Sequence, residues 1–225
     1  MSFKEGFYNQ ANEVNNSVEN KSSFDPDRKL SRTEQMEIND VEKNAEYDPD
    51  KRIDVIEPHE DGLYTSVEDR IKGTNRDLSE GGLRGCWNGE RGNSIFKPSY
   101  EYMKNRLAEY GKEGVEFKNG VVDFSPFSKA SVEIDHMTAD RGENFRQADI
   151  KLAENFSAEN RDGKSNWTPR DVNDYIQANK LTRHECSDMK TIELIPTSIH
   201  DYFGHYGGVA ECKIRDGVKG GNFDE

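Results

Sequence analysis

The spacing of apolar residues in the middle of the chain predicts a helix followed by a hairpin. Apolar side chains recur at helical spacing over residues 98–110, and Gly111 is typical of a helix end. Residues 115–124 then alternate like a strand pair, with Lys118-Asn119-Gly120 suited to the turn between the strands.

Two further helices are predicted from their starting residues. Asp140 precedes a glutamate by three positions, which is the spacing of a capping box, and the helix that it opens continues through Ala153. Thr168 is suited to cap a second helix, because Pro169 fits the first helical position without the loss of a hydrogen bond. We expect this helix to end near Asn179.

The pattern changes to strands toward the end of the chain. A strand is predicted from Leu181, and residues 190–196 read as a second strand by their β-branched and alternating character. A short helix over 199–204 should follow, with Thr197 or Ser198 as its cap. The predicted order is therefore strand, short turn, strand, short helix.

These elements predict an α+β fold with small sheets, in which residues 81–180 form a helical body. Residues 1–80 are expected to be an acidic linker or accessory region, because they hold 11 basic and 20 acidic residues and few apolar ones. Residues 81–225 hold 20 basic and 24 acidic residues, and the net charge of the whole chain is −13. Such acidity argues against a nucleic-acid partner, although less strongly for residues 81–225 than for residues 1–80.

The cysteines and the apolar runs limit the class of protein. Cys86, Cys186 and Cys212 are odd in number and lack C-x-x-C spacing, so we expect reduced thiols rather than a disulfide framework or a four-cysteine zinc site. No apolar run has membrane-spanning length, and no signal peptide is seen at the start. We therefore expect no membrane insertion.

Three of the five histidines fall within 22 residues, at His184, His200 and His205, with Glu185 beside the first. Imidazole and carboxylate are ligands for zinc and other first-row divalent ions, and histidine also titrates where a general base must. Such a group can equally be scattered over a surface. His200 and His205 converge only if Gly204 ends the short helix, because residues five apart on a helix point about 140° apart. We predict that it does.

Recognisable motifs accompany these histidines. The run His184-Glu185-Cys186-x-Asp188-Met189-Lys190-Thr191, then Leu194-x-Pro196, His200 and Gly204-His205-x-Gly207-Gly208, resembles the HNH/endonuclease VII superfamily. It is most similar to toxin nucleases with a Trp-His-His or Trp-His-Glu doublet, which form the tips of bacterial polymorphic toxins. Weaker upstream pieces in the same order are Trp87-x-Gly89-x-Arg91-Gly92-x-Ser94, Asp123-Phe124-Ser125-Pro126 and Arg141-x-x-x-Phe145-x-Gln147-Ala148-Asp149.

The resemblance covers roughly residues 84–215 and implies a toxin nuclease domain over 81–225. Near its C-terminus it implies a ββα-metal (HNH) finger at 181–208, holding one divalent ion, Mg²⁺, Mn²⁺ or Zn²⁺. It further implies hydrolysis of DNA, or alternatively RNA, a cognate immunity protein, and a carrier or secretion-system protein. The chain would then be a secreted or delivered effector that acts in the cytoplasm of a target cell.

Two departures from the family leave the residue roles open. Glu185 stands where many members have a second histidine, and we assign His184 as general base with Glu185, His200 and His205 as metal ligands. The reverse, with His184 on the metal and Glu185 as base, remains an alternative, because neighbours on a strand point to opposite sides.

Arg183 stands where the family usually has tryptophan, and with Lys190 it is a candidate for contact with nucleic acid. The ordinary explanation for either cation is solvated surface charge. A non-catalytic, metal-stabilised binding module or a degenerate nuclease that docks on a carrier is the alternative to an enzyme.

Overall fold

The computed structural model describes residues 56–217, and its contacts divide the chain into units 1–53 and 54–225. The helices are α2 (Val67–Gly73), α3 (Glu101–Ala108), α4 (Arg141–Ala158), α5 (Pro169–Ala178), α6 (Thr197–His200) and α7 (Gly208–Arg215), with 3₁₀ turns at Leu78–Glu80, Ser125–Phe127 and Arg161–Gly163. The strands are β1 (Gly85–Trp87), β2 (Ile95–Pro98), β3 (Val115–Lys118), β4 (Val121–Asp123), β5 (Ser131–Glu133), β6 (Leu181–Glu185) and β7 (Thr191–Pro196). The described unit is therefore a mixed α+β structure.

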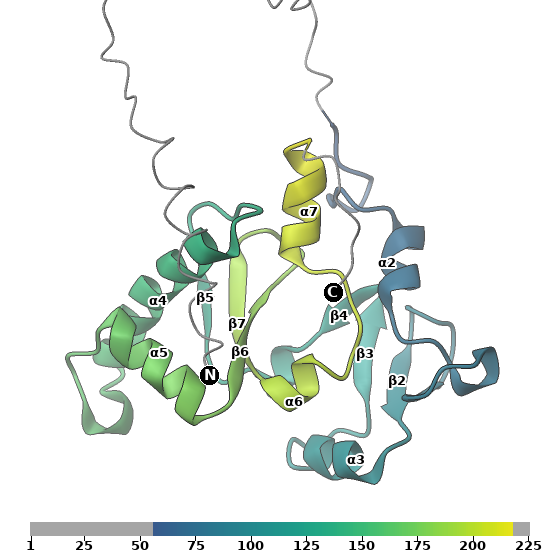
Figure 1. Cartoon of the computed structure of the whole chain (residues 1–225), viewed down its shortest axis with the longest axis horizontal. Coiled ribbons are helices and arrows are strands. Elements are labelled where there is room, and N and C mark those ends of the chain that lie inside the picture. Colours follow the sequence, from purple (N-terminus) through teal and green to yellow (C-terminus); the bar gives the residue numbers. More distant parts are fainter. Residues whose placement is uncertain (1–55, 218–225) are drawn as a thin grey trace, which may run out of the picture. The chain divides into compact units, whose positions relative to one another are not determined.

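The strands form two antiparallel sheets, one in the order β1-β2-β3-β4 and the other in the order β5-β7-β6 (Figure 1). The predicted hairpin is confirmed as β3 and β4. Its turn residues Asn119 and Gly120 both have positive φ, 52° and 77°, as the favoured two-residue turn requires. The predicted strand pair near the end of the chain is β6 and β7.

Local capping explains where the two longest helices begin. The carboxylate of Asp140 accepts hydrogen bonds from the amides of Gly142 and Glu143, but Glu143 pairs with Arg146, so the expected capping box is only half formed. The box at the start of α5 is complete, because Thr168 and Asp171 each accept a hydrogen bond from the backbone of the other.

Three expectations differ from the structure. Residues 81–180 are not only helical, because besides the predicted hairpin they hold β1, β2 and β5, whose three or four residues are too few for alternation to reveal. The helix expected over 98–110 is α3 alone, since Pro98 ends β2. The helix expected over 199–204 is α6, and neither Thr197 nor Ser198 caps it, because its cap position is Pro196.

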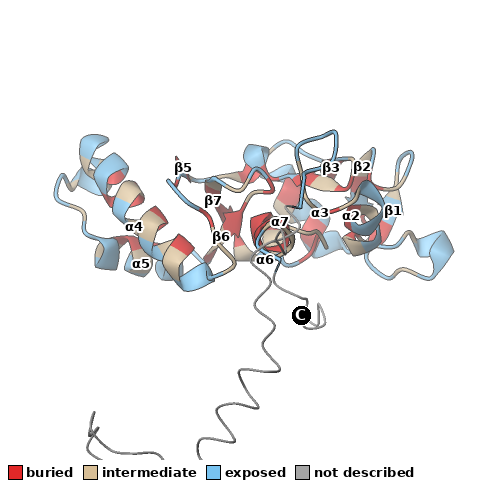
Figure 2. Ribbon diagram, turned by 90° about the horizontal axis from the view of Figure 1, so that it is seen from above, coloured by how far each residue is buried: buried red, intermediate tan, exposed pale blue. Residues whose placement is uncertain are grey.

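Two hydrophobic cores lie on either side of β6 and β7. The helix-side core packs α4 and α5 against one face of the smaller sheet, through buried residues that include Leu152, Phe156, Val172, Ile192 and Leu194. The sheet-side core joins the larger sheet to α3 and α6, through residues that include Phe96, Met103, Phe117, Ile195 and Phe203. In Figure 2 buried residues follow β6 and β7, which stand between α4 and α5 on one side and the larger sheet on the other. Because successive side chains of a strand point to opposite faces, β7 contributes Ile192 and Leu194 to the helix-side core and Ile195 to the sheet-side core.

Residues 64–75, here called the strap, are held against the rest of the described unit. The buried carboxylate of Glu211 in α7 accepts hydrogen bonds from the amides of Tyr64 and Thr65, at 2.6 and 2.8 Å, and from the Thr65 hydroxyl. The strap belongs to the region that the sequence assigned to an accessory role. The rest of that expectation, over residues 1–55, falls outside the described residues.

Within residues 56–217 no helix combines the length and the apolar character that crossing a membrane requires.

Candidate metal centre

His184 owes its direction to the pairing of β6 with β7. It lies opposite Glu193, whereas its neighbour Glu185 lies opposite Ile192. Because successive side chains of a strand point to opposite faces, His184 turns toward the sheet-side core and Glu185 toward the helix-side core. The two members of the doublet therefore have different surroundings.

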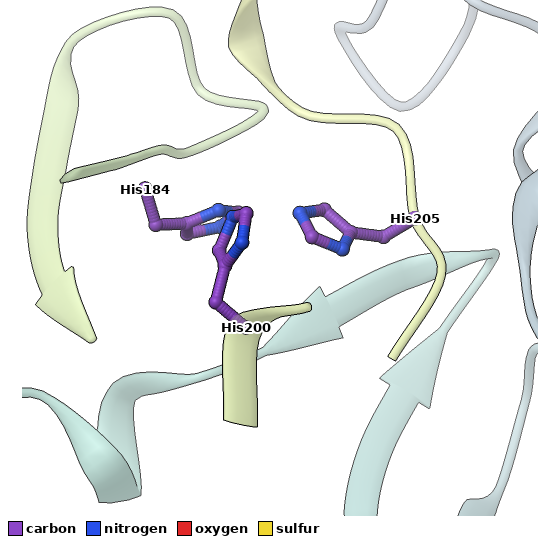
Figure 3. A group of neighbouring side chains, drawn as sticks. All are labelled: His184, His200 and His205. Carbon is purple, nitrogen blue, oxygen red and sulfur yellow. The ribbon is translucent and has the colours of Figure 1, made fainter. Parts of the chain in front are cut away.

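His200 and His205 approach His184 from the segment that follows β7. Figure 3 shows the three rings turned toward one another, from strand β6, the end of α6 and the loop after it. One ligand atom from each ring lies within 4.8 Å of the others, and the ring centroids are 5.5, 4.9 and 5.0 Å apart. The predicted convergence of His200 and His205 is confirmed, but the helix ends at His200 and not at Gly204.

Close backbone contacts bring the loop of His205 to its place. A Cβ atom on Gly207 would lie 2.6 Å from the carbonyl oxygen of Glu185, and one on Gly208 would lie 2.5 Å from that of Cys186. Only glycine permits this approach. From the other side the side-chain oxygen of Asn75, in the strap, accepts a hydrogen bond from the backbone amide of Gly204, at 2.9 Å.

Phe124 forms an apolar floor beneath all three imidazoles. Its ring centroid lies 5.0 Å from that of His184, 5.8 Å from that of His200 and 5.2 Å from that of His205. Phe124 is 1% exposed and directly follows β4, so the larger sheet supplies this floor. The packing limits how the three rings can turn, which preorganises them.

Hydrogen bonds orient His200 and His205, and burial keeps His184 and His205 neutral. The Nδ1 of His205 lies 2.8 Å from the Phe203 carbonyl oxygen, and that of His200 lies 3.2 Å from a carboxylate oxygen of Asp201. Both partners only accept, so each Nδ1 donates, and Nε2 is the nitrogen of each ring that could bind an ion. Burial, with its neighbours His205 and His200, holds the pKa of His184 well below its usual value. Burial first, and then His200, lowers the pKa of His205 to about 4.

This donor set fits a divalent transition-metal ion. A metal ion needs imidazoles with an unprotonated nitrogen, and burial lowers the pKa of His184 and of His205 accordingly. Three imidazoles also leave a fourth position of a tetrahedral ion open, which is the pattern of catalytic rather than structural zinc sites.

Glu185 is not brought into the three-histidine group, although the sequence analysis had placed it there. Its Oε1 accepts a hydrogen bond from the Asn144 side chain at 2.7 Å, and its Oε2 lies 3.4 Å from the Nε of Arg141. Burial raises the pKa of Glu185, against the opposing effects of Asn144 and Arg141. The result is a buried, oriented carboxylate with one exposed cation beside it.

The two candidate nucleic-acid contacts are both in ion pairs. Arg183 donates two hydrogen bonds of 2.8 Å to Asp149, and its side chain is only 12% exposed. Lys190 is exposed and its Nζ lies 3.3 Å from Glu133. Arg183 therefore has a structural partner that ties β6 to α4.

The comparison with protein families bears directly on this site. Residues 114–207 match the DNase/tRNase domain of colicin-like bacteriocins. The match begins just before β3 and includes all three histidines and Glu185. It supports a toxin nuclease domain of bacteriocin type, with hydrolase activity on a nucleic acid. No curated protein matches the chain.

Several residues of the site were missed by sequence reasoning. Phe124 appeared only within one of the motif pieces, and Asn144 and Asn75 had no signal at all. Arg141 began another motif piece but was given no role. These side chains lie far from the histidines in the sequence, and only the folded chain brings them near.

Proposed function

We propose that this chain is a metal-dependent endonuclease toxin that hydrolyses phosphodiester bonds in DNA and acts in competition between bacteria. The observation that carries the proposal is the convergence of three imidazoles on an apolar floor. The family match to a DNase/tRNase domain covers the same residues. A site of three imidazoles would leave room on a bound ion for water or substrate, which favours an enzyme over a binding module with a structural ion.

His184, His200 and His205 would hold the ion. Imidazole ligands favour Zn²⁺ or another transition metal over Mg²⁺, which prefers oxygen. When bound, such an ion stabilises negative charge on the phosphate and on the leaving oxygen. This assignment replaces the set Glu185, His200 and His205, because Glu185 lies on the opposite face of β6.

Glu185 would be the general base. Its carboxylate accepts a proton from the attacking water, and Asn144 holds it in a fixed orientation by hydrogen bonding to Oε1. The raised pKa makes it a stronger base than an exposed glutamate. The alternative that the sequence left open, His184 on the metal and Glu185 as base, is therefore the one that the geometry favours.

Arg141 would bind the scissile phosphate. Its side chain is 66% exposed, lies beside Glu185 and is close enough to His205 to lower the pKa of that ring. A guanidinium in this position attracts a phosphate locally, in a chain whose overall charge repels it. Arg183 is left out of this role because Asp149 engages it.

The rest of the proposal concerns how the toxin reaches its target and how the producing cell is protected. A toxin of this class is delivered into the cytoplasm of a target cell by a carrier or secretion system. A cognate immunity protein protects the cell that produces it. Lys190 is exposed and is kept as a peripheral contact to nucleic acid.

Digestion of plasmid DNA by the purified chain tests the proposal. Reactions contain Zn²⁺, Mn²⁺, Mg²⁺ or EDTA, and compare the wild type with His200→Ala and with His136→Ala, an exposed histidine outside the group. We expect cleavage that needs a metal, is lost in His200→Ala and persists in His136→Ala. Cleavage in EDTA or by His200→Ala would overturn the metal centre. Cleavage of RNA alone would overturn DNA as the substrate, and cleavage of neither would overturn the enzyme.

A further inference from the structure

A second group of metal-ligating side chains lies beside the three histidines. One ligand atom each from His184, Cys186 and Glu193 lies within 4.8 Å of the other two. The pairing of the strands accounts for this. His184 lies opposite Glu193, and Cys186 follows two residues later, so that it returns to the same face. The amide of Cys186 still bonds to β7, at 2.9 Å from the Thr191 carbonyl oxygen, which fixes its position.

The surroundings of this group suit a cation. Glu193 is buried and Cys186 is half-buried, so the group is shielded from solvent. Asp123 and Asp188 add negative charge that acts on both groups. A divalent ion would relieve this concentration of acidic groups.

We infer that His184, Cys186 and Glu193 form a second metal site, selective for thiophilic divalent ions such as Zn²⁺ and Cd²⁺, which competes with the three-histidine centre for His184. A set of nitrogen, sulfur and oxygen ligands is typical of zinc, and the thiolate discriminates against Mg²⁺ and Mn²⁺. On binding, the S–H bond breaks, the proton leaves to solvent and a bond between sulfur and the metal forms. No electron transfer is involved.

The shared histidine gives the second site a consequence for the activity proposed above, on which this part of the inference rests. An ion held by Cys186 and Glu193 engages His184, and the catalytic group is then left with His200 and His205. Thiophilic ions in excess would therefore inhibit a nuclease supported by Mn²⁺. Inhibition by this route requires the thiol, whereas simple exchange of ions at the three histidines does not.

Titration of the full chain with CdCl₂, without nucleic acid, tests the site itself. Bonding between sulfur and cadmium gives an ultraviolet charge-transfer absorbance. We expect this absorbance in the wild type, in His200→Ala and in Cys86→Ser, an exposed-cysteine control, and expect it to be absent in Cys186→Ser. Absorbance that persists in Cys186→Ser would overturn the site.

A second variant keeps the test decisive if Cys186→Ser does not fold. Glu193→Gln retains the thiol and removes one ligand, so the cadmium affinity should fall by about tenfold or more. An unchanged affinity in a folded Glu193→Gln protein would also overturn the site.

Cadmium added to the Mn²⁺-supported cleavage of DNA tests the competition. Each variant is compared with its own uninhibited rate, and we expect Cys186→Ser to need more cadmium than Cys86→Ser for the same inhibition. Equal sensitivity would overturn the competition. If the chain cleaves no nucleic acid at all, the proposed function fails, while the absorbance titration still decides whether the second site exists.

Discussion

The two faces of strand β6 differ although they are formed by adjacent residues. On one face His184 meets His200 and His205 over the apolar ring of Phe124. On the other face Glu185 meets an amide and a guanidinium beside the helix-side core. One strand thus separates the residues that would hold an ion from the residue that would accept a proton.

Burial acts on both faces but shifts their pKa values in opposite directions. It lowers the pKa of His184 and raises the pKa of Glu185, because desolvation always disfavours the charged form. Neutral imidazoles are what a metal ion requires, and a carboxylate with a raised pKa is a better base. Desolvation therefore suits one side chain to bind a metal ion and its neighbour to accept a proton.

The largest effect should come from Glu185→Gln, which keeps the shape of the side chain and removes its basicity. If the base lies on this face, the cleavage rate should fall by about 10²- to 10⁴-fold. Metal affinity, measured by calorimetric titration, should stay close to that of the wild type, because Glu185 is outside the histidine group.

Glu193→Gln is the matched comparison on the histidine face, since Glu193 pairs with His184 across the sheet. It should retain most of the cleavage rate in Mn²⁺. A larger loss in Glu193→Gln than in Glu185→Gln would show that the base shares a face with the histidines.

Truncation of the floor by Phe124→Ala should act mainly on stability. Removal of a fully buried phenylalanine ring typically lowers the free energy of unfolding by about 3–5 kcal/mol. Metal affinity should fall as well, because the three rings lose their common support. Urea denaturation with and without Zn²⁺ measures both effects. Phe127→Ala, another buried ring of the same core, serves as control. If both variants lost metal affinity equally, Phe124 would have no special part in orienting the histidines.

Removal of the cap by Thr168→Ala should have a smaller effect, confined to the helix-side core. Loss of an N-cap typically lowers the free energy of unfolding by about 1 kcal/mol. The cleavage rate per folded molecule should not change, because α5 packs in the helix-side core, on the face of β6 opposite His184. A fall in that rate would connect the helix-side core to the metal centre more closely than the comparison of faces allows.

The smallest effect should be a pH dependence at the same cap. Hydrogen bonds from Lys164 and Thr168 lower the pKa of Asp171 from 3.8 to about 2. Because the folded pKa lies below the unfolded one, the stabilisation is present above pH 4 and is lost as the pH falls toward 2. Thermal unfolding of Asp171→Asn should therefore depend less on pH in this range than unfolding of the wild type. Parallel curves for the two proteins would contradict this.

Features that depend on near neighbours could be predicted from the sequence. The cap at Thr168, the turn at Asn119-Gly120 and the order β6, β7, α6 each follow from residues within one short segment. The three histidines were found for the same reason, since 22 residues contain them all.

Features that depend on distant contacts could not be predicted. The hydrogen bond between Asn144 and Glu185 joins residues 41 positions apart, and no local pattern marks either as a partner of the other. The position of Phe124 depends on the larger sheet, two of whose strands have only three residues. The role of Glu185 needed the register of β6, because a shift of one residue exchanges its face with that of His184.

The hydrogen bonds between the strap and α7 determine how the molecule would respond to mechanical tension. A pull on the chain ahead of Tyr64 is transmitted directly to Glu211, which lies 147 positions away in the sequence. Helix α7 directly follows the loop that carries His205, and Asn75 of the strap bonds to that same loop. A narrow pore would exert such tension on a chain drawn through it from the end ahead of Tyr64. This tension should therefore separate the three histidines before it disturbs the packing of α4 on α5.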